Sequence, residues 1–279
     1  MIRSTRFQPL LLMTLGLVVA TLGCGSGGSA GSGGSGGAGG TNGGVLRILV
    51  TNDDGVGAEG IDAIVEALTA DPNNDVTVCG PLTNQSGTGD RTDCATGNAT
   101  DTTTQSGYPA TAVDGCPADA VNYALDPANG LYAADSLPHV VISGINEGQN
   151  VGEPVVGISG TVGAAKTAAR DHGIPALASS QGIPGPDGEY DYPAGVQAVL
   201  AWLAEHRAAL AAGDVTTAEI DSINIPSCDT GSIRGALEIG IAESSALQPQ
   251  DCESTLERPQ NDVEAFVNGY TTLSAVPAN

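Results

Sequence analysis

The sequence ILVTNDDG (residues 48–55) joins a short apolar run to two adjacent carboxylates, Asp53 and Asp54, and a glycine. A continuous apolar run of this length is typical of a buried β-strand. Asn and Asp favour turns and helix N-caps, so the Asp pair has a plain structural explanation. The same pair at the end of a buried strand is also suited to binding a cation. Residues elsewhere in the chain bear on which explanation is correct.

The rest of the sequence alternates strand and helix patterns, which predicts a Rossmann-like α/β core of three layers with a mostly parallel sheet. Beyond about residue 214, β-like segments follow one another without long helices, which predicts a β-rich C-terminal extension (about 214–279). Residues between 80 and 115 are rich in Thr and Gly and are expected to be irregular. The predicted strands are Leu46–Thr51, Asp75–Cys79, Pro138–Ser143, Ile174–Ser179, Ser222–Pro226, Ala236–Ser244 and Gly269–Val276. The predicted helices are Glu59–Thr69, Cys116–Leu125, Gly160–Asp171 and Tyr192–Ala212.

The first 24 residues have the pattern of an export signal, because Arg3 and Arg6 precede an apolar stretch. The sequence TLGC, which ends at Cys24, resembles a bacterial lipobox whose cysteine becomes lipidated. Ordinary secretory cleavage and an uncleaved anchor are the alternatives. Residues 25–44 are dominated by Gly and Ser and predict a flexible linker. We therefore expect one exported domain at residues 45–279, anchored to a membrane and facing the periplasm or cell surface, or otherwise periplasmic or secreted.

Acidic residues outnumber basic residues by 32 to 9, and the formal net charge is −23. Two of the basic residues, Arg3 and Arg6, belong to the predicted signal. Such a surface repels a phosphate backbone, so long nucleic acid is not expected as a partner. A small phosphate substrate would have to be held by a metal ion, by backbone N–H groups or by a few local donors.

Six cysteines are present, and the predicted export permits disulfides among those that follow Cys24. Cys79 lies in a predicted apolar strand and is expected to be a buried free thiol. The local pairs Cys94–Cys116 and Cys228–Cys252 are plausible, although the spacing does not fix the connectivity. The absence of a CxxC motif argues against a zinc site.

Polar side chains follow three of the predicted strands, at the point where each strand ends. Asp53 and Asp54 follow the first, Ser86 of NQSG follows the second, and Asn146 and Asn150 follow the third. Ligands of an open parallel sheet bind beyond the carboxyl ends of its strands, so these segments are expected to meet at one edge. Their donors are oxygens, which favour hard cations such as Mg²⁺, Mn²⁺ or Ca²⁺. Together they predict a metal site.

A further helix begins in the sequence ISGTVGAAKTAARDHG (residues 158–173). The free N–H groups near Ser159, Gly160 and Thr161 would form a phosphate cradle at the positive end of the helix dipole. An ordinary Ser/Thr N-cap is the structural alternative. The stretch GTVGAAKT misses the P-loop pattern by one residue, Ala165, whose Cβ would crowd a tight phosphate loop. We therefore disfavour a P-loop.

The blocks ILVTNDDG, NQSG, VVISGINEGQNVG and ISGTVGAAKTAARDHGIPALASS resemble, in order, the signature blocks of the SurE family, the survival-protein 5′/3′-nucleotidases. Weaker matches continue in CPADAVNYAL, SINIPS and NDVEAFVNGYTTLSAV, so the resemblance spans roughly residues 46–276. It implies a Rossmann-like core, homodimers or tetramers built through the C-terminal extension, and one divalent metal ion per subunit, Mg²⁺ or Mn²⁺. The implied activity is hydrolysis of nucleoside 5′- and 3′-monophosphates, in some relatives also of polyphosphate.

The resemblance also implies roles for individual residues, carried over block by block. As a separate hypothesis of mechanism, Asp53 or Asp54 would accept the proton of the attacking water as general base, and the sequence does not show which. The implied metal ligands are Asp53, Asp54, Ser86 and Asn146. The implied phosphate contacts are Asn150, Ser159, Gly160 and Thr161.

Three departures from the family pattern are visible. Most relatives are cytoplasmic, whereas this chain carries a predicted export signal and linker. Lys166 stands where Met or Glu is common, and residues 90–107 and those after Ser244 are divergent, so base recognition and oligomer contacts do not transfer. The alternative functions are a nonspecific acid phosphatase or exopolyphosphatase, or a non-catalytic surface lipoprotein that binds metal or nucleotide.

Overall fold

The computed structural model describes residues 44–128, 130–186, 188–245 and 247–279. The predicted export signal, the lipidation of Cys24 and nearly all of the predicted linker lie outside the described residues. The strands are β1 (Leu46–Thr51), β2 (Asn74–Pro81), β3 (Ala99–Thr103), β4 (Pro109–Val113), β5 (Val140–Glu147), β6 (Ala176–Gln181), β7 (Glu219–Ile225), β8 (Ala236–Glu238) and β9 (Thr271–Pro277). The helices are α1 (Glu59–Thr69), α2 (Pro117–Leu125), α3 (Glu153–Val156), α4 (Gly160–His172), α5 (Tyr192–Ala212) and α6 (Asp262–Val267).

The strands form one sheet in the order β3-β4-β2-β1-β5-β6-β7-β9-β8. Every pairing from β4 across to β7 is parallel, whereas β3 and β9 run antiparallel to β4 and β7. The predicted α/β fold with a mostly parallel sheet is therefore confirmed. The chain moves from β1 to β2 on one side and later places β5 on the other side of β1. This reversal is the position at which open α/β sheets bind ligands, beyond the carboxyl ends of the strands.

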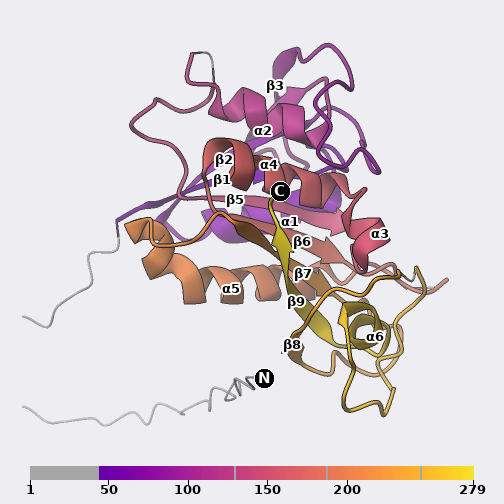
Figure 1. Cartoon of the computed structure of the whole chain (residues 1–279). Helices are drawn as coiled ribbons and strands as arrows, with labels where there is room; N and C mark the ends of the chain where they lie inside the picture. Colours follow the sequence, from indigo (N-terminus) through magenta and orange to yellow (C-terminus); the bar gives the residue numbers. More distant parts are fainter. Residues whose placement is uncertain (1–43, 129, 187, 246) are drawn as a thin grey trace, which may run out of the picture. The chain divides into compact units, whose positions relative to one another are not determined.

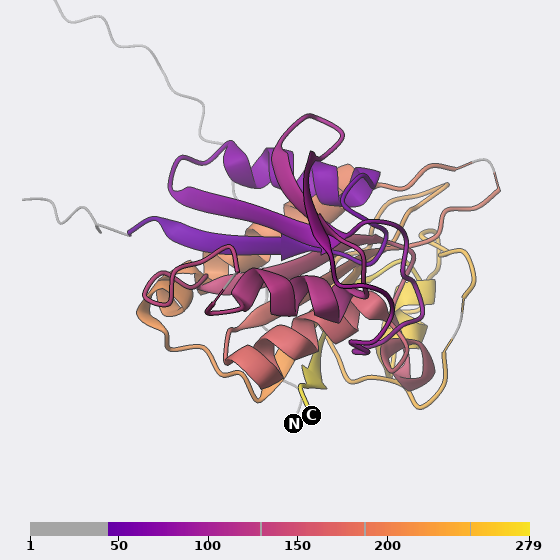
Figure 2. The same ribbon diagram turned by 90° about the horizontal axis from the view of Figure 1, so that it is seen from above.

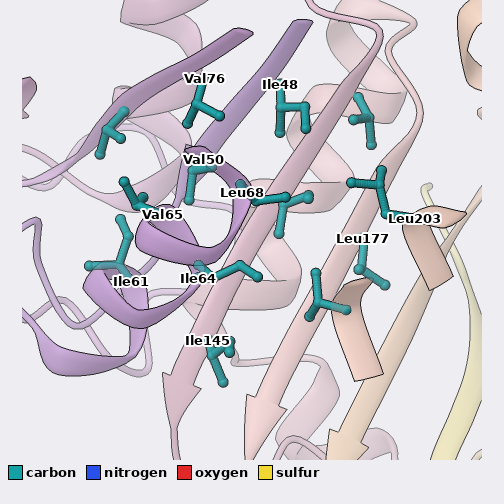
Figure 3. Close-up of a cluster of buried hydrophobic side chains, with 14 of the residues drawn as sticks. Ile48, Val50, Ile61, Ile64, Val65, Leu68, Val76, Ile145, Leu177 and Leu203 are labelled. Carbon is teal, nitrogen blue, oxygen red and sulfur yellow. The ribbon is translucent and has the colours of Figure 1, made fainter. Parts of the chain in front are cut away.

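Helices cover both faces of the sheet, which gives the three predicted layers (Figures 1 and 2). Figure 3 shows one face, where α1 directs Ile61, Ile64, Val65 and Leu68 toward the strands. The spacing of these four residues places them on one side of a helix. The cluster on the face of α1 and α5 includes Ile48, Val50, Ile142 and Leu177. The cluster on the face of α2 and α4 includes Leu49, Val141, Ala176 and Ala178.

The segment expected to be irregular contains two strands. β4 adds a parallel strand beside β2, and β3 pairs with β4 as an antiparallel edge strand. The prediction was wrong because β3, ATDTT, exposes most of its side chains and therefore lacks a buried apolar pattern. An edge strand of this kind is held by backbone pairing and not by a hydrophobic face.

Several predicted boundaries were also displaced. The third predicted strand extends through Glu147, so Asn146 lies inside β5, just past a register irregularity between Ser143 and Asn146. The fourth predicted strand begins two residues later than expected, at Ala176. The predicted segment Ala236–Ser244 is a strand only as far as Glu238. The short helices α3 and α6 were not predicted.

The C-terminal extension continues the main sheet. β7 pairs with β6 in parallel, β9 pairs with β7 in the antiparallel direction, and β8 occupies the edge beyond β9. The last strand of the described chain is therefore an internal strand of the sheet, and its central residues Thr272 and Ser274 are buried. No helix in the described part of the chain is long and apolar enough to cross a membrane.

The two disulfides are the local pairs that the sequence made plausible without fixing the connectivity. Cys94 is bonded to Cys116, and Cys228 is bonded to Cys252. Cys79 is a fully buried free thiol in β2, and its sulfur donates to the carbonyl oxygen of Ala120 at 3.3 Å. Burial raises the pKa of Cys79 to about 12.

We expect Cys79 to resist thiol reagents in the folded protein. Its pKa of about 12 leaves about a thousandfold less thiolate than an ordinary cysteine with a pKa near 9. A chain carrying Cys24→Ser, treated with a thiol reagent at pH 8 without reductant, should react only after denaturation and should then show one thiol. Rapid labelling of the native chain would contradict the buried position.

Candidate functional site

A tight turn after β1 places the two carboxylates at the edge of the sheet. The side chain of Asn52 donates to the carbonyl oxygen of Gly55 at 2.9 Å and accepts from the Gly55 N–H at 3.2 Å. Gly55 has a φ of 104°, a conformation that residues with a Cβ rarely adopt. This Asx-type turn projects Asp53 and Asp54 beyond β1.

Asp53 lies against the N-terminus of α4. Its side chain is 3% exposed, and its Oδ1 accepts a 2.7 Å hydrogen bond from the hydroxyl of Thr161. A Cβ added to Gly160 would lie 2.8 Å from the Cβ of Asp53, so only glycine allows this approach. Burial raises the pKa of Asp53, although the Thr161 hydroxyl and the backbone N–H groups of Thr161 and Gly160 act in the opposite direction. The helix therefore directs its free N–H groups toward this carboxylate.

Asp54 joins the other two segments of the predicted metal site. Its Oδ1 accepts from the amide of Asn84 at 3.1 Å, and its Oδ2 accepts from the backbone N–H of Glu147 at 2.9 Å. Burial, followed by the negative charge of Asp53, raises the pKa of Asp54 to about 7. The NQSG segment and the end of β5 thus converge on one carboxylate, as the topology of the sheet predicted.

Ser86 and Asn146 lie beside these contacts. The N–H of Ser86 donates to Oδ1 of Asn84 at 2.9 Å, and its hydroxyl belongs to an exposed residue. Asn146 is 6% exposed and donates its amide to the carbonyl oxygen of Gly148 at 2.5 Å. Because this contact uses the nitrogen of the Asn146 amide, the amide oxygen is the atom that could bind a cation. Their roles as metal ligands stay predictions.

The predicted phosphate residues lie on the segment that runs from β5 into α4. Asn150 is held by two residues of neighbouring strands: its N–H donates to Asn224 Oδ1 at 2.7 Å, and its amide donates to Ser180 Oγ at 2.8 Å. Ser159 is the N-cap of α4, and its Oγ accepts from Val162 N–H at 3.1 Å. The N-cap alternative therefore describes the side chain of Ser159. The hydroxyl of Thr161 is bonded to Asp53, and the N–H groups of Gly160 and Thr161 also act on that carboxylate, so a phosphate at α4 would share these donors with Asp53.

Sequence reasoning missed an aromatic pair near the carboxylates. The rings of Tyr190 and Tyr192 are stacked, with centroids 5.5 Å apart and planes 19° from parallel. Burial, followed by the negative charges of Glu147 and Asp54, raises the pKa of both tyrosines. They precede and begin α5, and nothing in the spacing EYDY distinguishes them from core residues.

The donor set fits a hard divalent cation. A buried carboxylate, Asp53, and a half-buried one, Asp54, stand next to each other, and no basic side chain is among the groups that shift the pKa of Asp54. Basic residues of the described chain make contacts elsewhere: Arg170 pairs with Asp90 and Asp171, and Arg207 pairs with Asp71. The surrounding oxygens are those of a hydroxyl and a carboxamide, which suit Mg²⁺ or Mn²⁺ better than zinc. A cation is therefore the natural counter-charge for this site.

The fold and the carboxylate pair at its switch point define an α/β protein of the doubly wound class. Comparison with solved structures supports the same fold: a SurE protein from Aquifex aeolicus superposes with a TM-score of 0.63. The two sequences are 23% identical, and the superposition covers 84% of this chain and 94% of that one.

The family model described as "Survival protein SurE" matches residues 48–246. The chain belongs to the SurE family. A curated protein named 5′-nucleotidase SurE from Methanoregula boonei is 36% identical over 199 residues, covering 69% of this chain and 71% of that protein. The protein of the same name from Halobacterium salinarum is 40% identical over 139 residues, covering 48% of this chain and 46% of that protein. The chain thus spans about half the length of the halobacterial relatives it matches.

Proposed function

We propose that this protein is a divalent-metal-dependent phosphomonoesterase that hydrolyses nucleoside 5′-monophosphates, and 3′-monophosphates as well. The observation that carries the proposal is the convergence on Asp54, whose two oxygens contact the NQSG segment and the end of β5. This convergence supports Asp53, Asp54, Ser86 and Asn146 as ligands of one Mg²⁺ or Mn²⁺ ion per subunit. The name 5′-nucleotidase carried by the matched relatives supports the substrate class.

In the proposed mechanism, the residues around Asp53 and Asp54 have different roles. A bound divalent ion would offset the charge of a phosphoryl group and make a water molecule more acidic. Asp53 or Asp54 accepts the proton of the attacking water. Thr161 fixes the orientation of Asp53 through its 2.7 Å hydrogen bond. The backbone N–H groups of Gly160 and Thr161, which also act on Asp53, and the amide of Asn150 hold the phosphoryl oxygens as charge accumulates on them.

We further propose that the protein acts outside the cytoplasm, as the N-terminal sequence indicates, and that lipid on Cys24 and the Gly/Ser linker hold it near a membrane. A dimer or tetramer built through the C-terminal extension completes the proposal. Export of such an activity would suit recovery of phosphate or nucleosides from the surroundings.

A phosphate-release assay tests the proposed activity. The panel contains nucleoside 5′- and 3′-monophosphates, a simple phosphate ester and polyphosphate, each with Mn²⁺, with Mg²⁺ and with EDTA. We expect metal-dependent release that is fastest with nucleoside monophosphates. Equal rates on every ester would indicate a nonspecific phosphatase, and release from polyphosphate alone an exopolyphosphatase. Binding of Mn²⁺ or nucleotide without any release would indicate the non-catalytic alternative.

Replacing Thr161 by valine should lower kcat/KM by about tenfold, since loss of a partner that orients a metal ligand typically costs 10–100-fold. Valine matches the shape of threonine but removes the hydroxyl that donates to Asp53. Thr167→Val is the matched control, because Thr167 is also fully buried in α4 but donates to the Gly163 carbonyl oxygen, within the helix. An equal loss in both variants would assign the effect to helix stability.

A further inference from the structure

Asp262 is a buried carboxylate that lies far along the chain from the candidate site. It is the first residue of α6 and is 2% exposed. Three backbone N–H groups donate to it: Oδ1 accepts from Ala242 at 2.7 Å and from Val263 at 2.8 Å, and Oδ2 accepts from Gly152 at 2.8 Å. A buried carboxylate with several backbone donors fixes the segments that supply them.

The Gly152 contact fixes the start of α3 against the C-terminal extension. The next residue, Glu153, donates its N–H to the carbonyl oxygen of Ala242 at 2.8 Å, so two successive N–H groups are held. Gly152 has a φ of 77°, and a Cβ there would overlap the carbonyl group of Ser244. The close approach therefore requires glycine at this position.

The held position lies between the two parts of the proposed phosphate site. Asn150 is two residues before Gly152. After it, α3 leads directly to Ser159, whose N–H donates to the Val155 carbonyl oxygen at 3.0 Å. A displacement of Gly152 would thus move both Asn150 and the N-terminus of α4. The carboxylates of the metal site are on another segment, the turn after β1.

We propose that Asp262 is a positioning residue for the phosphate-binding segment 150–161, an inference that rests on the proposed function. It does not touch the substrate. Through this carboxylate the C-terminal extension influences phosphate binding, because Asp262 holds the segment 150–161 at the geometry that phosphate binding requires. Misplacement of a binding group by about 1 Å can lower the rate by about a hundredfold.

Asp262→Asn tests this role with a small change in shape. An asparagine oxygen in the place of Oδ1 would still accept from Ala242 and Val263, but its amide nitrogen would then face the N–H of Gly152. Two donors cannot bond each other, so the Gly152 contact is lost while the other two persist. We expect at least about a tenfold rise in KM for AMP and in the inhibition constant of inorganic phosphate. The affinity for Mn²⁺ in the absence of phosphate should stay within twofold of the wild type.

Two further variants separate positioning from stability. Gly152→Ala changes the donor side of the same contact. It should likewise raise the KM for AMP and the inhibition constant of phosphate without changing the affinity for Mn²⁺. Asp62→Asn is the matched control, because Asp62 is 8% exposed and accepts from Ser106 N–H and Oγ, on a different segment. All rates are measured at least about 20 °C below the melting temperature of each variant. Both contacts of Asp62 are with Oδ1, where an asparagine oxygen would still accept, so the control should leave the KM for AMP unchanged with at most a small loss of stability.

The outcomes distinguish the inference from the function on which it rests. If the wild type releases no phosphate from any ester, the proposed function fails. If the wild type is active and Asp262→Asn keeps the wild-type KM and phosphate inhibition constant, the positioning role is refuted. Loss of Mn²⁺ affinity equal to the loss of phosphate affinity would also refute it, because the effect would then be a general one.

Discussion

Replacing Asp54 by asparagine is expected to lower phosphate release by at least about a hundredfold while the protein stays folded. Asparagine keeps the shape of the side chain and can accept one of the two hydrogen bonds, from Asn84 or from the Glu147 N–H, while its amide nitrogen faces the other donor. It also removes a negative charge from the proposed metal site. Asp53 is buried and Asp54 half-buried, and relief of the repulsion between them offsets part of the lost hydrogen bond, so the variant should stay folded without metal. Initial rates with Mn²⁺ and thermal melts with and without Mn²⁺ measure both effects.

Asp101→Asn is the matched control for this experiment. Asp101 lies exposed on the edge strand β3, so the same chemical change there should leave the rate and the Mn²⁺-induced rise in melting temperature unaltered. An Asp54→Asn variant with wild-type turnover and a wild-type response to Mn²⁺ would falsify the assignment of Asp54.

Replacing Gly163 by alanine is expected to destabilise the fold by about 2–3 kcal/mol. Gly163 lies in the second turn of α4, and a Cβ there would overlap the carbonyl group of Gly89. The added Cβ would meet backbone atoms of Gly89, and these cannot move aside as the end of a flexible side chain would. The segment around Gly89 is also held by its N–H, which donates to the Ile158 carbonyl oxygen at 2.9 Å. A domain of this size should melt about 4–10 °C lower.

The same substitution should weaken metal binding, because the displaced segment carries Ser86 three residues earlier. Gly57→Ala is the control: no atom lies within 4 Å of a Cβ added there. It should change the free energy of unfolding by less than about 0.5 kcal/mol. Equal stabilities for Gly163→Ala and Gly57→Ala would show that α4 and the Gly89 segment can separate without cost.

The core strands could be predicted because burial on both faces leaves a continuous apolar signal. β1 and β5 are almost entirely buried, and both were found from their sequences alone. The approach of Asp54 to the end of β5 followed from topology, since parallel strands bring their carboxyl ends to one edge. The membership of the SurE family, which the sequence blocks predicted, is confirmed.

Other features depend on contacts that no local pattern encodes. β3 has no apolar face, and its position is set by backbone pairing with β4. Asp262 stands in an ordinary N-terminal helix pattern, and only the folded chain shows that its carboxylate holds Gly152, 110 residues earlier. The stacked Tyr190 and Tyr192 likewise become neighbours of Asp54 only through the packing of α5.

The insertion of β9 between β7 and β8 has a consequence for how the protein can be inactivated. A protease that removed the tail from residue 262 onward would take away an interior strand together with the carboxylate that anchors Gly152. The remaining chain would expose the unpaired edge of β7, a template for aggregation. A single cleavage at residue 262 would thus inactivate the protein irreversibly, because the remaining chain would aggregate. The cleaved bond lies more than a hundred residues along the chain from the carboxylates of the site.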